Sequence, residues 1–130
     1  MTARVLMVDD EPDAEPLLRQ QFRREVREGL YRLEFARSGQ TALHMLDGRA
    51  GDEMLLDINM PGMSGLDLLP KIKGSKPGLP VFVISVYGDA DTVSTARKRG
   101  ADQFLTKPMD FVELRRDIMA VQADAMRRNA

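Results

Sequence analysis

The sequence contains no cysteine and no apolar run long enough to cross a bilayer. Without cysteine there is neither a disulfide framework nor a thiolate metal site. The apolar stretch that opens the chain is too short for a signal peptide, so we expect a cytoplasmic protein with no membrane partner. No glycine-rich phosphate loop follows the first apolar run, which disfavours a nucleotide enzyme.

An excess of charge of either sign is also missing. The 19 basic and 20 acidic residues give a formal net charge of -1, and the basic residues form no cluster longer than a pair. A nucleic-acid-binding protein usually carries a strong basic patch. We therefore expect no direct contact with nucleic acid, and partners that are recognised locally.

The length and composition predict one domain over residues 1–130. A chain of 130 residues with 43% hydrophobic composition can bury one sizeable core but hardly two. Short apolar runs alternate with longer amphipathic runs, which is typical of an α/β fold around a mostly parallel sheet. We predict five helices and strands at Val5–Val8, Leu33–Ala36, Met54–Leu56, Val81–Ile84 and Gln103–Thr106.

The helical patterns have one irregularity. Leu18, Phe22 and Val26 repeat every four residues and predict a single first helix. The third helical pattern contains Pro70, which cannot donate a hydrogen bond to the carbonyl of Leu66. We still predict a helix there, with a local loss of one hydrogen bond.

Polar residues follow four of the five predicted strands. Because the carboxyl ends of parallel strands share one edge of a sheet, these residues should converge there. Each alone is ordinary, since acids often begin helices and a serine or a Lys-Pro pair often occurs in loops. Four together indicate a site, formed by Asp9 and Asp10, Asp57, Ser85, and Lys107 with Pro108.

Three converging carboxylates repel one another by about 4 kcal/mol per pair at about 4 Å and an effective dielectric constant near 20. A lysine offsets part of this repulsion, and Mg²⁺ suits carboxylate oxygens. A cluster of acids, one lysine and one hydroxyl is therefore a candidate phosphoryl-transfer site.

Four segments of the chain resemble the receiver domain of bacterial two-component response regulators. They read "VLMVDDEPD", "LLDINMPGMSGLDLL", "VFVISVYGD" and "GADQFLTKPMD", and the resemblance covers nearly the whole chain. It implies a doubly wound, flavodoxin-like (βα)5 fold with a five-stranded parallel sheet in the order 2-1-3-4-5.

The resemblance also implies roles for individual residues. Asp57 would be the phosphoacceptor. Asp10 would bind Mg²⁺ directly, Asp9 would help through water, and the backbone carbonyl of Asn59 would complete the ligands from the protein.

A second group of residues would respond to the phosphate. Ser85 resembles the switch hydroxyl, and Lys107 the lysine that pairs with the phosphoryl group. Phe104 occupies the place of the aromatic residue that rotates inward, and the bond between Lys107 and Pro108 would be cis. Access to the phosphate would be flanked by Val86, Tyr87 and Asn59.

These roles predict a phosphorylation-dependent switch and not an enzyme, apart from catalysis of its own phosphorylation and dephosphorylation. The phosphoryl donor would be a sensor histidine kinase or a phosphotransfer protein. The surface of the fourth helix, fifth strand and fifth helix would then change and control an output domain or protein.

Two other functions are alternatives. A Mg²⁺-dependent aspartyl-phosphate phosphatase of the haloacid-dehalogenase-like class would need an Asp-x-Asp pattern after its first strand, and this chain has Asp9-Asp10-Glu11 instead. A docking module independent of phosphorylation is disfavoured by the complete set of acids, hydroxyl and lysine.

The C-terminal region allows two interpretations. A helix over about residues 110–129 would close the domain or continue as a connector to an output domain. A homodimer could form through the fourth and fifth helices, although a solvated surface explains their charges equally well. These charged residues are Arg97, Lys98, Asp102, Arg115 and Asp117.

Overall fold

The computed structural model describes residues 2–48, 53–59 and 65–128, with the side chains of 47–48 and 125–128 left out. In these ranges five parallel strands form one sheet in the order β2-β1-β3-β4-β5. The strands are β1 (Ala3–Val8), β2 (Tyr31–Ala36), β3 (Glu53–Asp57), β4 (Val81–Ser85) and β5 (Gln103–Thr106). The predicted α/β class and strand order are confirmed, and strand ends differ from the prediction by at most two residues.

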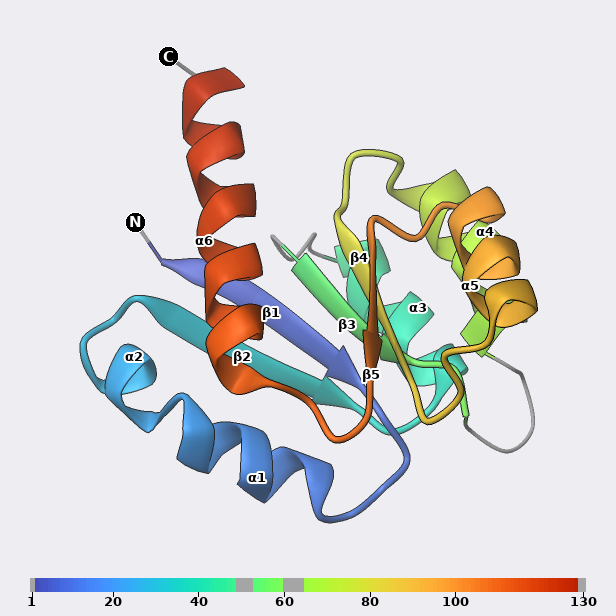
Figure 1. Ribbon diagram of the computed structural model, residues 1–130. Helices are drawn as coiled ribbons and strands as arrows, with labels where there is room; N and C mark the ends of the chain where they lie inside the picture. Colours follow the sequence, from blue (N-terminus) through green and yellow to red (C-terminus); the bar gives the residue numbers. More distant parts are fainter. Residues whose placement is uncertain (1, 49–52, 60–64, 129–130) are drawn as a thin grey trace.

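Six helices accompany the sheet in the described part of the chain, one more than predicted. They are α1 (Ala14–Gln21), α2 (Arg23–Arg27), α3 (Gly39–Gly48), α4 (Gly65–Ser75), α5 (Ala90–Lys98) and α6 (Phe111–Arg128). Figure 1 shows α1, α2 and α6 on one side of the sheet and α3, α4 and α5 on the other, with all strand arrows pointing toward the lower part of the view.

The extra helix arises because the predicted first helix is interrupted at Phe22. This residue has φ −108° and ψ 20°, outside the helical range. Its ring is fully buried against Tyr31 and Phe111 in edge-to-face contacts. Arg115 of α6 donates a hydrogen bond to the carbonyl of Gln21 and lies over the Phe22 ring. The prediction of one continuous helix is therefore wrong, because a contact from α6 competes with helical geometry.

The two faces of the sheet carry separate apolar clusters. Side chains of β1, β3 and β4 that point to one face pack on α3, α4 and α5 through residues such as Leu46, Leu69 and Ala96. Those on the other face pack on α1 and α6 through Leu18 and Leu114. A central sheet that is covered on both faces explains why β3 and β4 are buried at every position.

The predicted helix around Pro70 is confirmed, and the structure shows what replaces the missing hydrogen bond. Pro70 lies inside α4. The guanidinium of Arg99, at the end of α5, donates to the carbonyl of Leu66 at 2.9 Å and also lies 3.2 Å from Asp67. A residue from another helix thus satisfies the acceptor that proline leaves without its helical donor.

Some expectations fall on residues that the structure does not describe. Residues 60–64, which belong to the second of the four matching segments, and the end of the predicted C-terminal helix at residue 129 lie outside the described ranges. Within those ranges no helix is long and apolar enough to cross a membrane.

Candidate phosphoryl-transfer site at the strand ends

The site begins at Asp57, the last residue of β3. This carboxylate is 1% exposed, because β3 lies between β1 and β4 and both faces of the sheet are covered. Its Oδ2 accepts a hydrogen bond from Lys107 Nζ at 2.8 Å, and its Oδ1 accepts one from the backbone N–H of Asn59 at 2.8 Å. Both carboxylate oxygens are thus oriented by groups of the protein.

Asp9 and Asp10 follow β1, the neighbour of β3, and therefore reach the same point. One carboxylate oxygen from each of Asp9, Asp10 and Asp57 lies within 4.8 Å of the others. Asp9 is 7% exposed and Asp10 is half-buried. The predicted convergence of these acids is what the coordinates show, and their oxygens match the ligands that Mg²⁺ prefers.

Burial raises the pKa of Asp9 from its ordinary value of 3.8 to about 6. The negative charge of Asp57 adds to this increase, while the backbone N–H of Glu11 and the charge of Lys107 oppose it. The Glu11 N–H donates to Asp9 Oδ1 at 3.0 Å. In the absence of a further cation, Asp9 therefore carries a proton below about pH 6, well above the pH at which an ordinary aspartate ionises.

Lys107 is the cation that faces these acids. Its Nζ lies 2.8 Å from Asp57 and 3.7 Å from Asp9. Burial alone would lower the pKa of Lys107, but its hydrogen bond with Asp57 and the charges of Asp57 and Asp9 outweigh burial and raise the pKa. The amine is thus held in its charged form, and the Lys107–Pro108 bond that follows it is cis.

Ser85, at the end of β4, is linked to the same site through Asn59. Its hydroxyl is fully buried and donates to Asn59 Oδ1 at 2.9 Å. Its backbone carbonyl accepts the N–H of Lys107 at 2.9 Å. Hydrogen bonds therefore join Asp57, Asn59, Ser85 and Lys107 in a closed ring across three strand ends.

Three further predicted residues lie on β5 or directly after β4. Val86 and Tyr87 follow Ser85 and are 53% and 63% exposed. Phe104, on β5, is half-buried against the cluster beneath α3, α4 and α5. Val86 and Tyr87 thus lie at the carboxyl end of β4, Phe104 lies within β5 opposite Val83, and their roles in phosphate access and switching stay predictions.

Two features of the site were missed by the sequence analysis. The sequence did not predict that the side chain of Asn59 accepts hydrogen bonds from Ser85 and Val86 and so joins β3 to β4. Gly65, at the start of α4, lies so close to β3 that an added Cβ would be 2.5 Å from Ile58 Cα and 2.8 Å from the Asp57 carbonyl oxygen. No sequence signal indicated this close approach, which lets α4 pack directly against the end of β3 because Gly65 has no Cβ.

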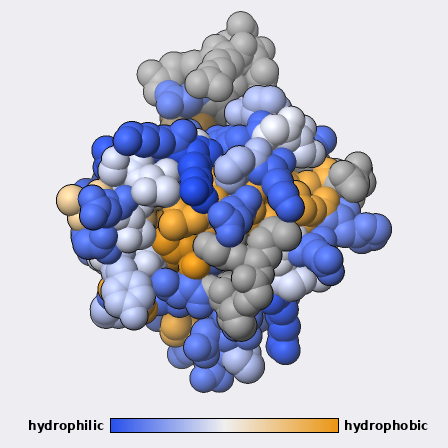
Figure 2. Space-filling view, turned by 90° about the vertical axis from the view of Figure 1, so that its right-hand side faces the viewer, coloured by the Kyte–Doolittle hydropathy of each residue, from blue (hydrophilic) through white to orange (hydrophobic). Residues whose placement is uncertain are grey.

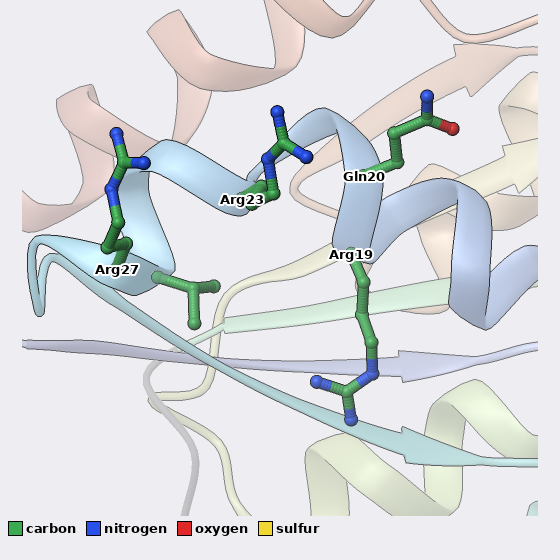
Figure 3. Close-up of a pocket in the computed structure, with 5 residues that line it drawn as sticks. Arg19, Gln20, Arg23 and Arg27 are labelled. Carbon is green, nitrogen blue, oxygen red and sulfur yellow. The ribbon is translucent and has the colours of Figure 1, made fainter.

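A separate hollow of about 510 Å³ lies on α1 and α2, lined by Arg19, Gln20, Arg23, Val26 and Arg27. Figure 3 shows the Arg19 guanidinium pointing toward β2 and those of Arg23 and Arg27 pointing the other way. Arg19 lies over the Phe35 ring, 4.8 Å from its centroid. The three cations do not converge on one point, and no acid, hydroxyl or lysine of the strand ends lines this hollow.

The strand order and the acidic cluster at the carboxyl edge define a doubly wound α/β protein with a candidate phosphoryl-transfer site. Residues 5–119 match the family model described as the response regulator receiver domain. The chain belongs to this family of signalling domains.

Relatives by sequence include the response regulator protein PilR of Pseudomonas aeruginosa, 40% identical over 86% of this chain and 24% of PilR. Regulatory protein AtoC of Escherichia coli is 31% identical over 98% of this chain and 28% of AtoC. The chain thus spans about a quarter of the length of these relatives. Sporulation initiation phosphotransferase F of Bacillus subtilis is 30% identical, with 88% of this chain and 90% of that protein covered.

Solved structures show the same fold. The receiver domain of a putative LuxO repressor from Vibrio parahaemolyticus has a TM-score of 0.87 at 24% identity, covering 99% of this chain and 96% of that one. A CheX–CheY–BeF3–Mg²⁺ complex from Borrelia burgdorferi includes a chain with a TM-score of 0.80 and 30% identity, covering 92% of this chain and 88% of that one.

Proposed function

We propose that this chain is a switch operated by phosphorylation of Asp57. The carrying observation is the Asp57 carboxylate, which is buried at the end of β3, paired with Lys107 at 2.8 Å and within 4.8 Å of two further acids. A phosphoryl group on a carboxylate oxygen of Asp57 would contact Lys107 and lie beside Asp9 and Asp10. The chain's donor would be a phosphohistidine of a sensor kinase or phosphotransfer protein.

In this transfer a carboxylate oxygen of Asp57 attacks phosphorus, a P–O bond forms, and the P–N bond of the donor breaks with its electrons left on the imidazole. Lys107 holds a phosphoryl oxygen electrostatically, and the N–H of Asn59 orients the attacking carboxylate. Hydrolysis reverses the state, since water attacks phosphorus, its proton leaves with phosphate, and the Asp57 carboxylate returns. These steps serve the chain's own signalling state, so we propose no activity on other substrates.

The acidic cluster fits Mg²⁺, because one carboxylate oxygen from each of Asp9, Asp10 and Asp57 lies within 4.8 Å of the others. Asp10, Asp57 and the backbone carbonyl of Asn59 would bind the ion, with Asp9 acting through water. The bound ion would neutralise charge on the oxygens of the transferred group. The CheY complex at 30% identity, which was solved with Mg²⁺ and BeF3, supports this proposal.

The signal would leave through α5, β5 and α6. Ser85 ends β4 and Phe104 lies on β5, so inward movement of the Ser85 hydroxyl would vacate space toward Phe104.

Figure 2 views the α4 and α5 side and shows a largely hydrophilic surface with a band of apolar surface. Of the charges considered for a dimer, Asp102 binds Lys73 and Arg115 binds Glu25 within the chain. Homodimerisation and control of an output domain through α6 stay predictions.

Intact-mass measurement tests the proposed function. With a small acyl phosphate and Mg²⁺, the chain should gain one phosphoryl group, and Asp57→Asn should gain none because an amide is not a nucleophile of this kind. Asp13→Asn, which changes an exposed acid on the loop between β1 and α1, is the control and should be phosphorylated like the parent. Rapid turnover of many phosphoesters would indicate a phosphatase instead, and no adduct in any condition would indicate a docking module.

A further inference from the structure

The hydroxyl of Ser85 donates one hydrogen bond and accepts another in this structure. It donates its proton to Asn59 Oδ1 at 2.9 Å and accepts the backbone N–H of Tyr87 at 3.0 Å. A serine hydroxyl has a single proton to donate. Ser85 therefore cannot donate to a phosphoryl oxygen while it donates to Asn59.

The amide of Asn59 is held in one orientation by a second donor. Its Oδ1 also accepts the backbone N–H of Val86 at 3.0 Å, so the oxygen and not the NH₂ group must face β4. The backbone N–H of the same residue donates to Asp57 Oδ1 at 2.8 Å. Asn59 is thereby bonded to the proposed phosphoacceptor through its backbone and to the proposed switch hydroxyl through its side chain.

We infer that the side chain of Asn59 is a latch that positions Ser85 in the unphosphorylated conformation, an inference that rests on the proposed function. Phosphorylation offers Ser85 an ionised oxygen as acceptor, and such charge-assisted bonds are about twice as strong as neutral ones. The hydroxyl of Ser85 then donates its hydrogen bond to a phosphoryl oxygen instead of to the amide oxygen of Asn59. Asn59 is a positioning residue in this scheme, because it acts through Ser85.

The latch sets how readily the domain enters its active conformation without phosphate. One neutral hydrogen bond contributes a net free energy equivalent to about a fivefold change in a two-state equilibrium. Removing the acceptor should therefore raise the population of the inward Ser85 conformation by about fivefold. Restoring an acceptor oxygen at the same place should reverse the effect.

The test compares Asn59→Leu, which keeps the size of the side chain and removes the acceptor, with Asn59→Asp, which keeps it. In metal-free protein, amide hydrogen exchange at Tyr87, whose N–H is bonded to the Ser85 hydroxyl, should accelerate in Asn59→Leu by about fivefold and stay near the parent rate in Asn59→Asp. Equal exchange in the parent and Asn59→Leu would overturn the latch. This measurement involves no phosphate, so it does not depend on whether Asp57 is phosphorylated.

A double-mutant cycle separates the latch from simple opening of the site. Asn59→Leu should increase the initial rate of phosphorylation by acyl phosphate about fivefold in the parent but not in the Ser85→Ala background. An equal increase in both backgrounds would mean that the side chain only blocks access, and the latch would be wrong. Absence of phosphorylation in the parent would instead overturn the proposed function, while the exchange result stands by itself.

Discussion

The carboxylate of Asp9 makes the site costly to build without a cation. Its pKa is raised to about 6, so above this pH the folded protein must hold an ionised, buried acid next to Asp57. Between the unfolded value near 3.8 and the folded value near 6, the folded state binds the proton more strongly than the unfolded state. Stability from this group is therefore present at low pH and lost as pH rises through about 6.

Because ionised Asp9 destabilises the folded state, Asp9→Asn should stabilise the protein in metal-free buffer. At about pH 7.5 the substitution should increase the free energy of unfolding by about 2 kcal/mol, and at about pH 3 the gain should nearly vanish, because Asp9 is then protonated in both the folded and the unfolded state. Urea unfolding at both pH values measures this difference. The exposed Asp13→Asn serves as the control and should change stability by less than about 0.5 kcal/mol. A gain confined to the lower pH would contradict the assigned cause.

Among the elements, α4 and α5 depend on each other through Arg99. Pro70 leaves the Leu66 carbonyl without its helical donor, and the Arg99 guanidinium takes that place at 2.9 Å. The ion pair of Arg99 with Asp67 is largely exposed and should add little. The hydrogen bond to the carbonyl is therefore the main contribution of this arginine.

Arg99→Met, which keeps most of the aliphatic stem, should lower the free energy of unfolding by about 1 kcal/mol. In a Pro70→Ala background the loss should shrink, because the introduced alanine has the backbone N–H that Pro70 does not have and can donate it to the Leu66 carbonyl. Chemical denaturation of the four proteins in this cycle measures the coupling. Arg97→Met on the same helix is the control, since Arg97 is exposed and should be nearly neutral. An unchanged cost in both backgrounds would refute the compensation.

For the molecule as a whole, the sequence was sufficient for the sheet and for the acidic cluster. Apolar runs fixed five strands, and a parallel sheet necessarily brings residues after those strands to one edge, as Asp9 and Asp57 show. The sequence did not predict contacts between side chains that are far apart along the chain. The bonds from Asn59 to Ser85 and from Arg99 to Leu66 join residues 26 and 33 positions apart, and no local pattern encodes them.

Mg²⁺ binding should couple the site to the stability of the whole domain. A ligand that binds only the folded state stabilises it by about 2.7 kcal/mol at a concentration about 100 times its dissociation constant. Because a proton on Asp9 competes with a cation at this cluster, Mg²⁺ should bind more weakly below about pH 6 than above it. The increase in melting temperature with Mg²⁺ should therefore be larger at about pH 8 than at about pH 5.

Thermal unfolding with and without Mg²⁺ at the two pH values tests this coupling, and no phosphate donor is needed. Asp10→Asn should remove most of the increase, because it deletes a proposed direct ligand, whereas Asp13→Asn should keep it. Asp9→Asn should keep part of the increase and lose its dependence on pH, because the group that exchanges a proton is gone. If the pH dependence survived in Asp9→Asn, another residue would have to carry the proton, and Asp9 would not be the group that links cation binding to pH.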